Sequence, residues 1–215
     1  MSTRALVVVG GDDTHHDLLG AADVLTRIGA GAGFATAPAV GMQRFANARP
    51  ETADADVYVL YDSGASFPGA QQAALAAAVA AGKGLVALHM SNVMSDPQGA
   101  DRAFFELLGN HYLSHGPGHH EGRHRIEIVA QHPITDGVED FELFDEYYEF
   151  AFADEDHLVL AERAREDGVR IPVLYVREVG EGRVVYLALG HDMRAWGEPP
   201  FRRLVTQAIR WAGRA

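Results

Sequence analysis

Short apolar segments alternate with segments of helical periodicity along most of the chain. Continuously apolar runs, which predict strands buried on both faces, occur at Ala5–Val9, Val57–Tyr61, Leu85–Leu88, Val173–Val176 and Val184–Leu189. Amphipathic or alanine-rich runs, which predict helices, occur at His16–Ile28, Pro68–Ala81, Phe104–Leu108 and Pro200–Ala212. Continuous apolar strands are typical of parallel sheets covered by helices. The alternation predicts an α/β fold with a doubly wound, mostly parallel sheet, and a single domain over residues 1–215.

The segment from about residue 123 to residue 163 departs from this alternation. Strands are expected at Arg125–Val129 and His157–Ala161, and Asp145–Phe150 is a further candidate. We expect these strands to form an antiparallel or edge elaboration of the sheet. Gly180–Arg183 lies between two predicted strands and has the composition of a hairpin turn.

The composition narrows the possible classes of function. Acidic residues number 30 and basic residues 18, which gives a formal charge of −12. Such a chain is poorly suited to bind nucleic acid, which requires clustered Lys and Arg. Cysteine is absent, so disulfides, thiolate metal sites and cysteine nucleophiles are excluded. No segment approaches the roughly 20 apolar residues that span a bilayer, and we expect a cytoplasmic protein that does not bind membranes.

Three histidines, His16, His89 and His191, follow predicted strands. Ligands of open α/β sheets bind beyond the carboxyl ends of the strands, so these histidines are expected at one edge. A single histidine there is most simply a polar residue near a helix N-terminus, but three together favour a functional cluster. Neutral imidazole is both a common metal ligand and a general acid or base. Asp62 and Asn92 also follow predicted strands.

Two glycine-rich segments need separate interpretations. Gly10–Gly11 lacks the spacing of a dinucleotide-binding or phosphate-binding loop, so it is read as a tight turn and no nucleotide cofactor is expected. The second segment, Ser114–Gly122, is expected to be an exposed loop. The histidines expected to be solvated in or beside this loop are His119, His120 and His124.

A series of short motifs runs nearly from end to end of the chain. It comprises Val9–Gly11 with His16–Asp17, Gly82–His89, Leu107–Gly109 with His115, His132–Gly137, Asp145–Glu146 with Tyr148, and the longer stretch Pro172–Trp211. In this order they resemble the trehalose-utilisation, ThuA-like family, a branch of the class I glutamine amidotransferase-like superfamily. The chain departs from the family pattern at Met90, at Asn110 and in the His-Gly-Pro-Gly-His-His insert after Ser114.

The resemblance implies a flavodoxin-like sheet with a pocket at its carboxyl edge. Glutamine amidotransferases carry a nucleophilic cysteine on a sharp turn after a central strand, and this chain carries His89 at the similar place. Their His-x-Glu pair resembles His191–Asp192 here. Thiol-based glutamine hydrolysis is excluded because the chain has no cysteine. The family is linked to sugar catabolism, often beside dehydrogenases that make 3-keto sugars.

The resulting hypothesis is a metal-assisted hydrolase, lyase or isomerase that acts on a sugar or a 3-keto sugar glycoside. A divalent metal, with zinc favoured, is expected on His16, His89 and His191. His115 is expected to be a reserve ligand or the general acid. The substrate is a small sugar, and a sugar dehydrogenase is a candidate partner.

The family pattern also assigns roles to carboxylates. Glu146 is the expected general base, although it lies in an acidic stretch that is otherwise typical of a surface. Asp192 is expected to orient a metal-binding imidazole without binding the metal itself. The residues expected to bind substrate hydroxyls are Asp62, Asn92 and Tyr148.

Two further classes stay open. The chain fits a non-catalytic module that kept the amidotransferase-like fold and serves as a partner subunit of a sugar dehydrogenase. It also fits a metal-free hydrolase that uses Ser91 or Ser63 with a histidine, although neither serine lies in a Gly-x-Ser-x-Gly motif. A homodimer is compatible with the fold.

Overall fold

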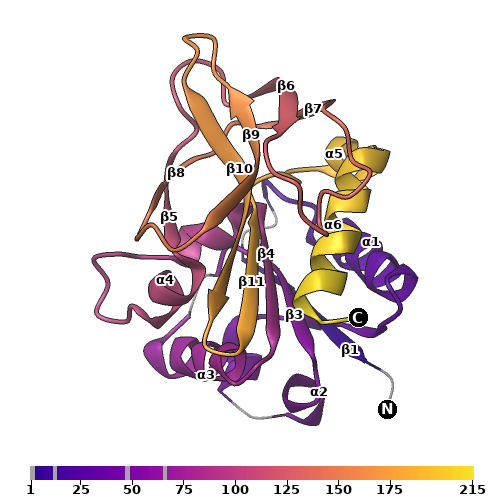
Figure 1. The fold of residues 1–215 in the computed structure, drawn as a ribbon. Coiled ribbons are helices and arrows are strands. Elements are labelled where there is room, and N and C mark those ends of the chain that lie inside the picture. Colours follow the sequence, from indigo (N-terminus) through magenta and orange to yellow (C-terminus); the bar gives the residue numbers. More distant parts are fainter. Residues whose placement is uncertain (1–2, 12–13, 47–48, 65–66) are drawn as a thin grey trace.

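The computed structural model describes residues 3–11, 14–46, 49–64 and 67–215. A nine-stranded sheet with the order β2-β1-β3-β4-β11-β10-β9-β6-β7 runs through the molecule (Figure 1). One half of it consists of parallel strands, namely β1 (Arg4–Gly10), β2 (Ala35–Val40), β3 (Val57–Asp62), β4 (Gly84–Leu88) and β11 (Gly182–Leu187). The predicted α/β fold with a parallel, helix-covered sheet is confirmed.

The other half of the sheet is antiparallel and includes the elaboration predicted over 123–163. Its strands are β6 (Glu121–Ile128), β7 (Phe141–Glu146), β9 (Leu158–Ala164) and β10 (Arg170–Val179). A separate two-stranded sheet pairs β5 (Asn110–Ser114) with β8 (Glu149–Phe152). The hairpin predicted at Gly180–Arg183 joins β10 to β11, which pair antiparallel.

The continuous apolar pattern of Val173–Val176 suggested a parallel strand, but the run does not belong to one. It lies in β10, which is antiparallel to both of its neighbours. The rings of Phe150 and Phe152 from β8 pack against Tyr175 of β10, with centroids 6.1 and 5.1 Å apart. The small sheet thus covers β10, and a strand covered on both faces is continuously apolar whatever its direction.

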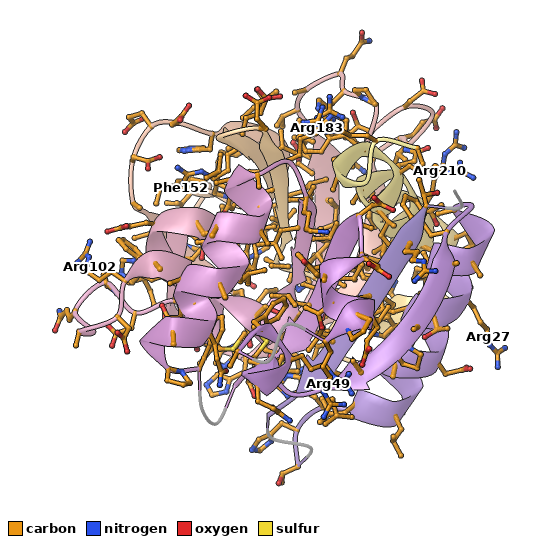
Figure 2. The ribbon with its side chains drawn as sticks, turned by 90° about the horizontal axis from the view of Figure 1, so that it is seen from below. Arg27, Arg49, Arg102, Phe152, Arg183 and Arg210 are labelled. Atoms are coloured by element: carbon orange, nitrogen blue, oxygen red, sulfur yellow. The ribbon has the colours of Figure 1, made fainter. Side chains whose placement is uncertain are left out.

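Helices cover both faces of the parallel half (Figure 1). Helices α1 (Leu18–Gly31), α5 (Met193–Gly197) and α6 (Pro199–Ala212) contact one another, and α3 (Gly69–Ala80) contacts α4 (Ala103–Leu108). The short elements are α2 (Pro50–Ala53) and the 3-10 helices η1 (Met42–Phe45) and η2 (His89–Met94). Charged side chains such as Arg27 and Arg102 project outward from this shell (Figure 2).

The ends of α1 and α6 follow from local sequence. Asp17 caps α1, its Oδ1 accepting a hydrogen bond from the Gly20 amide at 2.8 Å. The helix therefore begins at Leu18, two residues later than predicted, and His16 lies in the preceding loop. Helix α6 begins at Pro199, where proline is favoured because the first amides have no helical partner. Within the described residues, no helix is long and apolar enough to cross a membrane.

Candidate functional site

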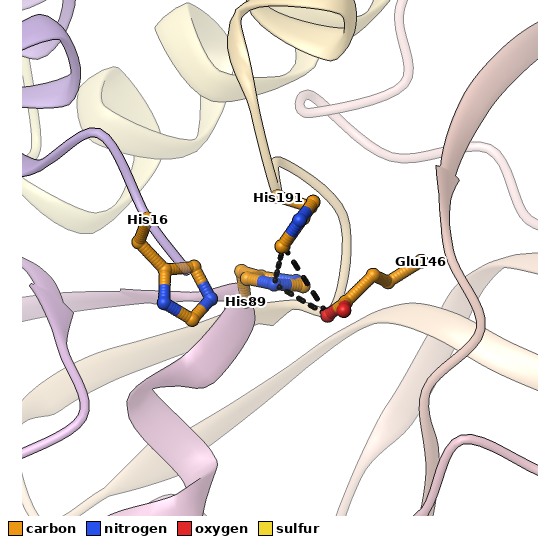
Figure 3. Close-up of side chains that lie close together, drawn as sticks. All are labelled: His16, His89, Glu146 and His191. Carbon is orange, nitrogen blue, oxygen red and sulfur yellow. Dashed lines mark hydrogen bonds and ion pairs between the residues drawn. The ribbon is translucent and has the colours of Figure 1, made fainter. Parts of the chain in front are cut away.

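The three histidines predicted to meet at the sheet edge do meet there (Figure 3). His16 comes from the loop between β1 and α1, His89 follows β4 directly, and His191 lies in the loop between β11 and α5. Their ring centroids form a triangle with sides of 5.1, 5.3 and 5.3 Å. These loops leave the carboxyl ends of parallel strands, which explains how residues so distant in sequence become neighbours.

His89 occupies a strained turn directly after β4. Its φ of 45° lies in the left-handed region, which non-glycine residues seldom adopt. The side chain is fully buried, and its Nδ1 lies 2.9 Å from the carbonyl oxygen of Ala188. Because a carbonyl only accepts, Nδ1 carries a proton, and Nε2 faces the centre of the cluster, where a neutral ring would offer its lone pair to a metal ion. Metal-binding histidines typically have this arrangement.

His191 is held through its backbone by a buried carboxylate. Asp145, near the end of β7, accepts hydrogen bonds from the amides of Gly190 at 2.6 Å and His191 at 2.9 Å. Its Oδ1 also accepts from the amide of Glu146 at 2.9 Å. One carboxylate therefore fastens the His191 loop to the strand end that carries Glu146. Burial raises the pKa of Asp145.

Gly190 permits the turn that precedes His191. Its φ is +112°, and a Cβ at this position would lie 3.0 Å from the ring of Phe201 and 3.2 Å from that of Trp196. The Gly190 carbonyl accepts hydrogen bonds from the Tyr61 hydroxyl at 2.9 Å and the Trp196 indole at 3.0 Å. The turn is thus fixed from several sides.

Glu146 completes the cluster from the antiparallel half of the sheet. Its Oε2 lies 3.3 Å from His89 Nε2 and 3.3 Å from His191 Nδ1, and those two nitrogens are also 3.3 Å apart. Burial acts to raise the pKa of Glu146, but the hydrogen bonds and charges of His191 and His89 outweigh it and hold the pKa well below its ordinary value. Burial acts to lower the pKa of His191, and the contact with Glu146 more than reverses this.

These atoms fit a divalent metal ion. One ligand atom each from His16, His89, Glu146 and His191 lie within 4.8 Å of one another. Two ligands that are each about 2.0–2.1 Å from a tetrahedral zinc ion lie about 3.3–3.4 Å apart, so the observed 3.3 Å triangle matches this geometry. Imidazole and carboxylate are also ordinary zinc ligands.

A neighbouring cluster of two carboxylates and a histidine is neutralised by an arginine. Glu121, His191 and Asp192 also place ligand atoms within 4.8 Å of one another. However, the Arg194 guanidinium forms ion pairs with both carboxylates, at 2.8 Å to Glu121 and in close contact with Asp192. The arginine already neutralises these acids, so only the first group has the character of a metal site.

His115 and Tyr148 flank the cluster on the side of Glu146. His115 Nδ1 lies 3.2 Å from the carbonyl oxygen of Tyr147 and 4.0 Å from Glu146 Oε2. The ring of Tyr148 lies 4.3 Å from the ring of His89. Burial lowers the pKa of His115, so the imidazole is neutral near pH 7 and can accept a proton.

Comparison with known proteins identifies the family. The family model for ThuA, described as trehalose utilisation, matches residues 4–212. The chain belongs to the ThuA family. No curated protein matches the chain significantly.

Solved structures share the fold of this ThuA protein. A putative ThuA-like protein from Parabacteroides merdae superposes with a TM-score of 0.80 at 17% identity, over 99% of this chain and 90% of that one. One from Bacteroides uniformis gives 0.77 at 17% identity, over 98% and 91%. A β-galactosidase from Bacillus circulans gives 0.63 at 14% identity, over 97% of this chain and 31% of that enzyme. At these identities the likeness concerns the fold alone.

The remaining predicted site residues lie close to this edge in different settings. Asp192 caps α5, and its two oxygens accept from the Arg194 amide at 2.8 Å and guanidinium at 2.7 Å. Asp192 was expected to orient an imidazole of the cluster. For His89, the carbonyl oxygen of Ala188 is the group that contacts the second ring nitrogen. Asp62 and Asn92 are buried, and Asp62 Oδ1 accepts from the Gly64 amide at 2.6 Å. Burial raises the pKa of Asp62.

The histidine-rich loop divides into exposed and buried members. His119 and His120 are exposed, as predicted. The prediction for His124 was wrong, because its side chain is buried against the ring of Tyr147, with centroids 4.4 Å apart. His124 lies in β6, so tertiary packing and not loop composition decides its exposure.

Sequence reasoning assigned no role to Asp145 or Tyr61. Asp145 precedes Glu146 in one of the motifs that carry the resemblance, and this adjacency was the only signal in the sequence. The Tyr61 hydroxyl contacts the carbonyls of Gly190 and His191, a link across 130 positions that no sequence pattern reports.

Proposed function

We propose that this ThuA protein is a metal-dependent enzyme of sugar catabolism, a hydrolase, lyase or isomerase whose substrate is a sugar or a 3-keto sugar glycoside. The observation that carries the proposal is the triangle of His89 Nε2, His191 Nδ1 and Glu146 Oε2 with sides of 3.3 Å. The family description, trehalose utilisation, supports the sugar substrate.

In this proposal, His16, His89, Glu146 and His191 hold the ion. The geometry favours Glu146 as a ligand over the general base that the sequence suggested, because its Oε2 faces both imidazole nitrogens equally. A divalent ion here would polarise a carbonyl oxygen or lower the pKa of a bound water molecule. Asp145 is a positioning residue that keeps His191 and Glu146 together.

His115 is the group that moves the proton. Its Nδ1–H points to the Tyr147 carbonyl, so Nε2 is available to the substrate. In a 3-keto glycoside, His115 takes the proton from the carbon next to the ketone. The C–H electrons form a double bond, the glycosidic C–O bond breaks, and the leaving oxygen receives the proton from His115. Tyr148, whose ring lies beside that of His89, binds a sugar hydroxyl. Asp62 and Asn92 were expected to do the same, but both side chains are fully buried, so the proposal assigns them no contact with the sugar.

Zinc binding by variants of the proposed ligands tests the metal site, and His15, the neighbour of His16 in sequence, provides the control. Wild type, His16→Ala, His89→Ala and Glu146→Ala are purified without chelator, and zinc content and zinc affinity are measured. We expect about one zinc per chain in wild type and a loss of affinity of 100-fold or more in the three variants, since each lacks a ligand. His15→Ala changes an exposed neighbour and is the matched control.

The same proteins are then assayed on a 3-keto glucoside and on the glucoside without the ketone. Turnover that requires zinc, His115 and the ketone supports the full proposal. A wild-type protein that binds no zinc, or binds it equally with and without His89, contradicts the metal site. A protein that binds zinc tightly but converts no carbonyl sugar contradicts the enzymatic part.

A further inference from the structure

A pocket adjoins the candidate site at His115. A pocket of about 620 Å³ lies between β6, β9 and the loop before β6, with Tyr147 and Glu149 in its wall. His115 lines this pocket and also lies 4.0 Å from Glu146 in the histidine cluster. His115 therefore borders both the histidine cluster and the pocket.

The pocket contains a buried guanidinium without a carboxylate partner. Arg163 of β9 is 4% exposed, and its Nε and Nη2 have no hydrogen-bond partner. The guanidinium lies 4.9 Å from the centre of the Tyr147 ring, and Tyr147 in turn rests on Gly122, where any Cβ would collide with its hydroxyl. The cation–π contact compensates only part of the cost of burying a charge.

The other arginines of the pocket are already paired. Arg165 forms ion pairs with Glu149 at 2.9 Å and with Asp167, and Arg123 lies 3.7 Å from Glu142. Of the cations that line the pocket in the described part of the chain, Arg163 is the one that no carboxylate approaches within 4.0 Å. The charge of Glu149 acts on Arg163 only from beyond 4.0 Å. A buried positive charge without a directly paired carboxylate departs from the ordinary rule of charge pairing, and such departures concentrate at functional sites.

His124 adds a complementary feature to the same wall. Its Nε2 lies 2.9 Å from the Asp145 carbonyl oxygen, so Nε2 carries the proton. Burial lowers the pKa of His124 to about 4, which keeps the ring neutral at pH 7. The buried Nδ1 is then an acceptor, and it has no hydrogen-bond partner. The wall of the pocket thus contains an unpartnered cationic donor, Arg163, and an unpartnered neutral acceptor, His124.

We propose that this pocket binds the oxyanion of an anionic sugar, a carboxylate or a phosphate, through Arg163, while His124 Nδ1 accepts a hydrogen bond from a neighbouring hydroxyl. The inference rests on the proposed function in one respect, namely that the same sugar places its reacting carbons beside His115. Anion recognition itself requires neither the metal nor turnover.

Binding is measured by calorimetry at low salt on wild type, Arg163→Met and Arg125→Met, with glucuronate, glucose 6-phosphate, inorganic phosphate and glucose as probes. We expect saturable binding of glucuronate or glucose 6-phosphate, weakened about 10- to 100-fold in Arg163→Met because a charge-assisted hydrogen bond is lost. Arg125 is an exposed arginine one position along from His124 and outside the pocket lining, so Arg125→Met should bind as wild type does.

Thermal unfolding separates recognition from a structural role. Replacing an unpaired buried charge with an apolar side chain of similar length should leave the melting temperature unchanged or raise it. The anionic sugar should raise the melting temperature of wild type and not that of Arg163→Met. A fall in melting temperature in Arg163→Met without any ligand effect in wild type would show that Arg163 is structural and would overturn the proposal.

Failure of the anion-binding proposal is distinguishable from failure of the metal site, because Glu146→Ala without zinc should still bind the anionic sugar. Preference for glucuronate assigns a carboxylate, and preference for glucose 6-phosphate assigns a phosphate. Either supports the proposal if binding depends on Arg163. Absence of saturable binding of all three anions to wild type, or equal affinity in wild type and Arg163→Met, overturns it.

Discussion

Replacing Asp145 with asparagine tests how the His191 loop is held against Glu146. The buried carboxylate accepts three amide hydrogen bonds, from Gly190 at 2.6 Å, His191 at 2.9 Å and Glu146 at 2.9 Å. Asparagine has the same shape but presents an NH₂ donor on one side, where it must face an amide donor. At least one charge-assisted bond, worth about 1.5–3 kcal/mol, is lost, and one amide is left unsatisfied.

We expect Asp145→Asn to lower the free energy of unfolding by about 2–4 kcal/mol. Because His191 is displaced, we expect zinc affinity to fall about 10- to 100-fold, the usual effect of removing a group that orients a ligand. Denaturant unfolding and competitive zinc titration measure the two quantities separately. Asp140→Asn, which changes an aspartate on the surface beside β7, is the control and should shift stability by less than about 1 kcal/mol. Normal zinc affinity in Asp145→Asn would refute this reasoning.

Two further changes test the local physics. The pKa of His124 is about 4 in the folded chain because of burial, against about 6.5 when unfolded. Between these values the unfolded chain binds more protons, so stability present above pH 6.5 is lost as the pH falls toward 4, by up to about 3 kcal/mol. The free energy of unfolding of His124→Gln should lack this part of the pH dependence. Parallel curves of unfolding free energy against pH for wild type and His124→Gln would contradict the prediction. Gly190→Ala should cost about 2–4 kcal/mol, because φ is +112° and the Cβ would crowd Phe201 and Trp196. Gly197→Ala, where a Cβ meets nothing within 4 Å, should be nearly neutral, and equal stability of the two variants would contradict the argument.

The parallel half of the fold and the histidine cluster could be predicted because both depend on short-range signals. Continuous apolar runs mark strands, and the residues that follow parallel strands share one edge. His16, His89 and His191 are therefore placed by strand ends alone. β2 escaped prediction because Ala35–Val40 is mostly exposed and contains Pro38, as suits a strand at the edge of a sheet.

The antiparallel half could be predicted only in outline, because its placement depends on packing between distant segments. Glu146 ends β7, the last strand of the sheet, and it reaches the histidines only because Asp145 draws that strand end onto the His191 loop. Only the resemblance to the ThuA-like family pointed to Glu146, and the periodicity of the sequence did not. Likewise, the burial of His124 depends on a tyrosine 23 positions away in sequence. Arg163 carries no signal in the sequence, because its lack of a partner is a property of the folded molecule.

Crystals of protein purified without chelator, measured on both sides of the zinc absorption edge, would test the central claim most directly. We predict an anomalous peak about 2.0–2.2 Å from His89 Nε2, His191 Nδ1 and Glu146 Oε2, with His16 completing the site. Direct hydrogen bonds among these atoms with no anomalous peak, in protein soaked with zinc at neutral pH, would contradict the metal site.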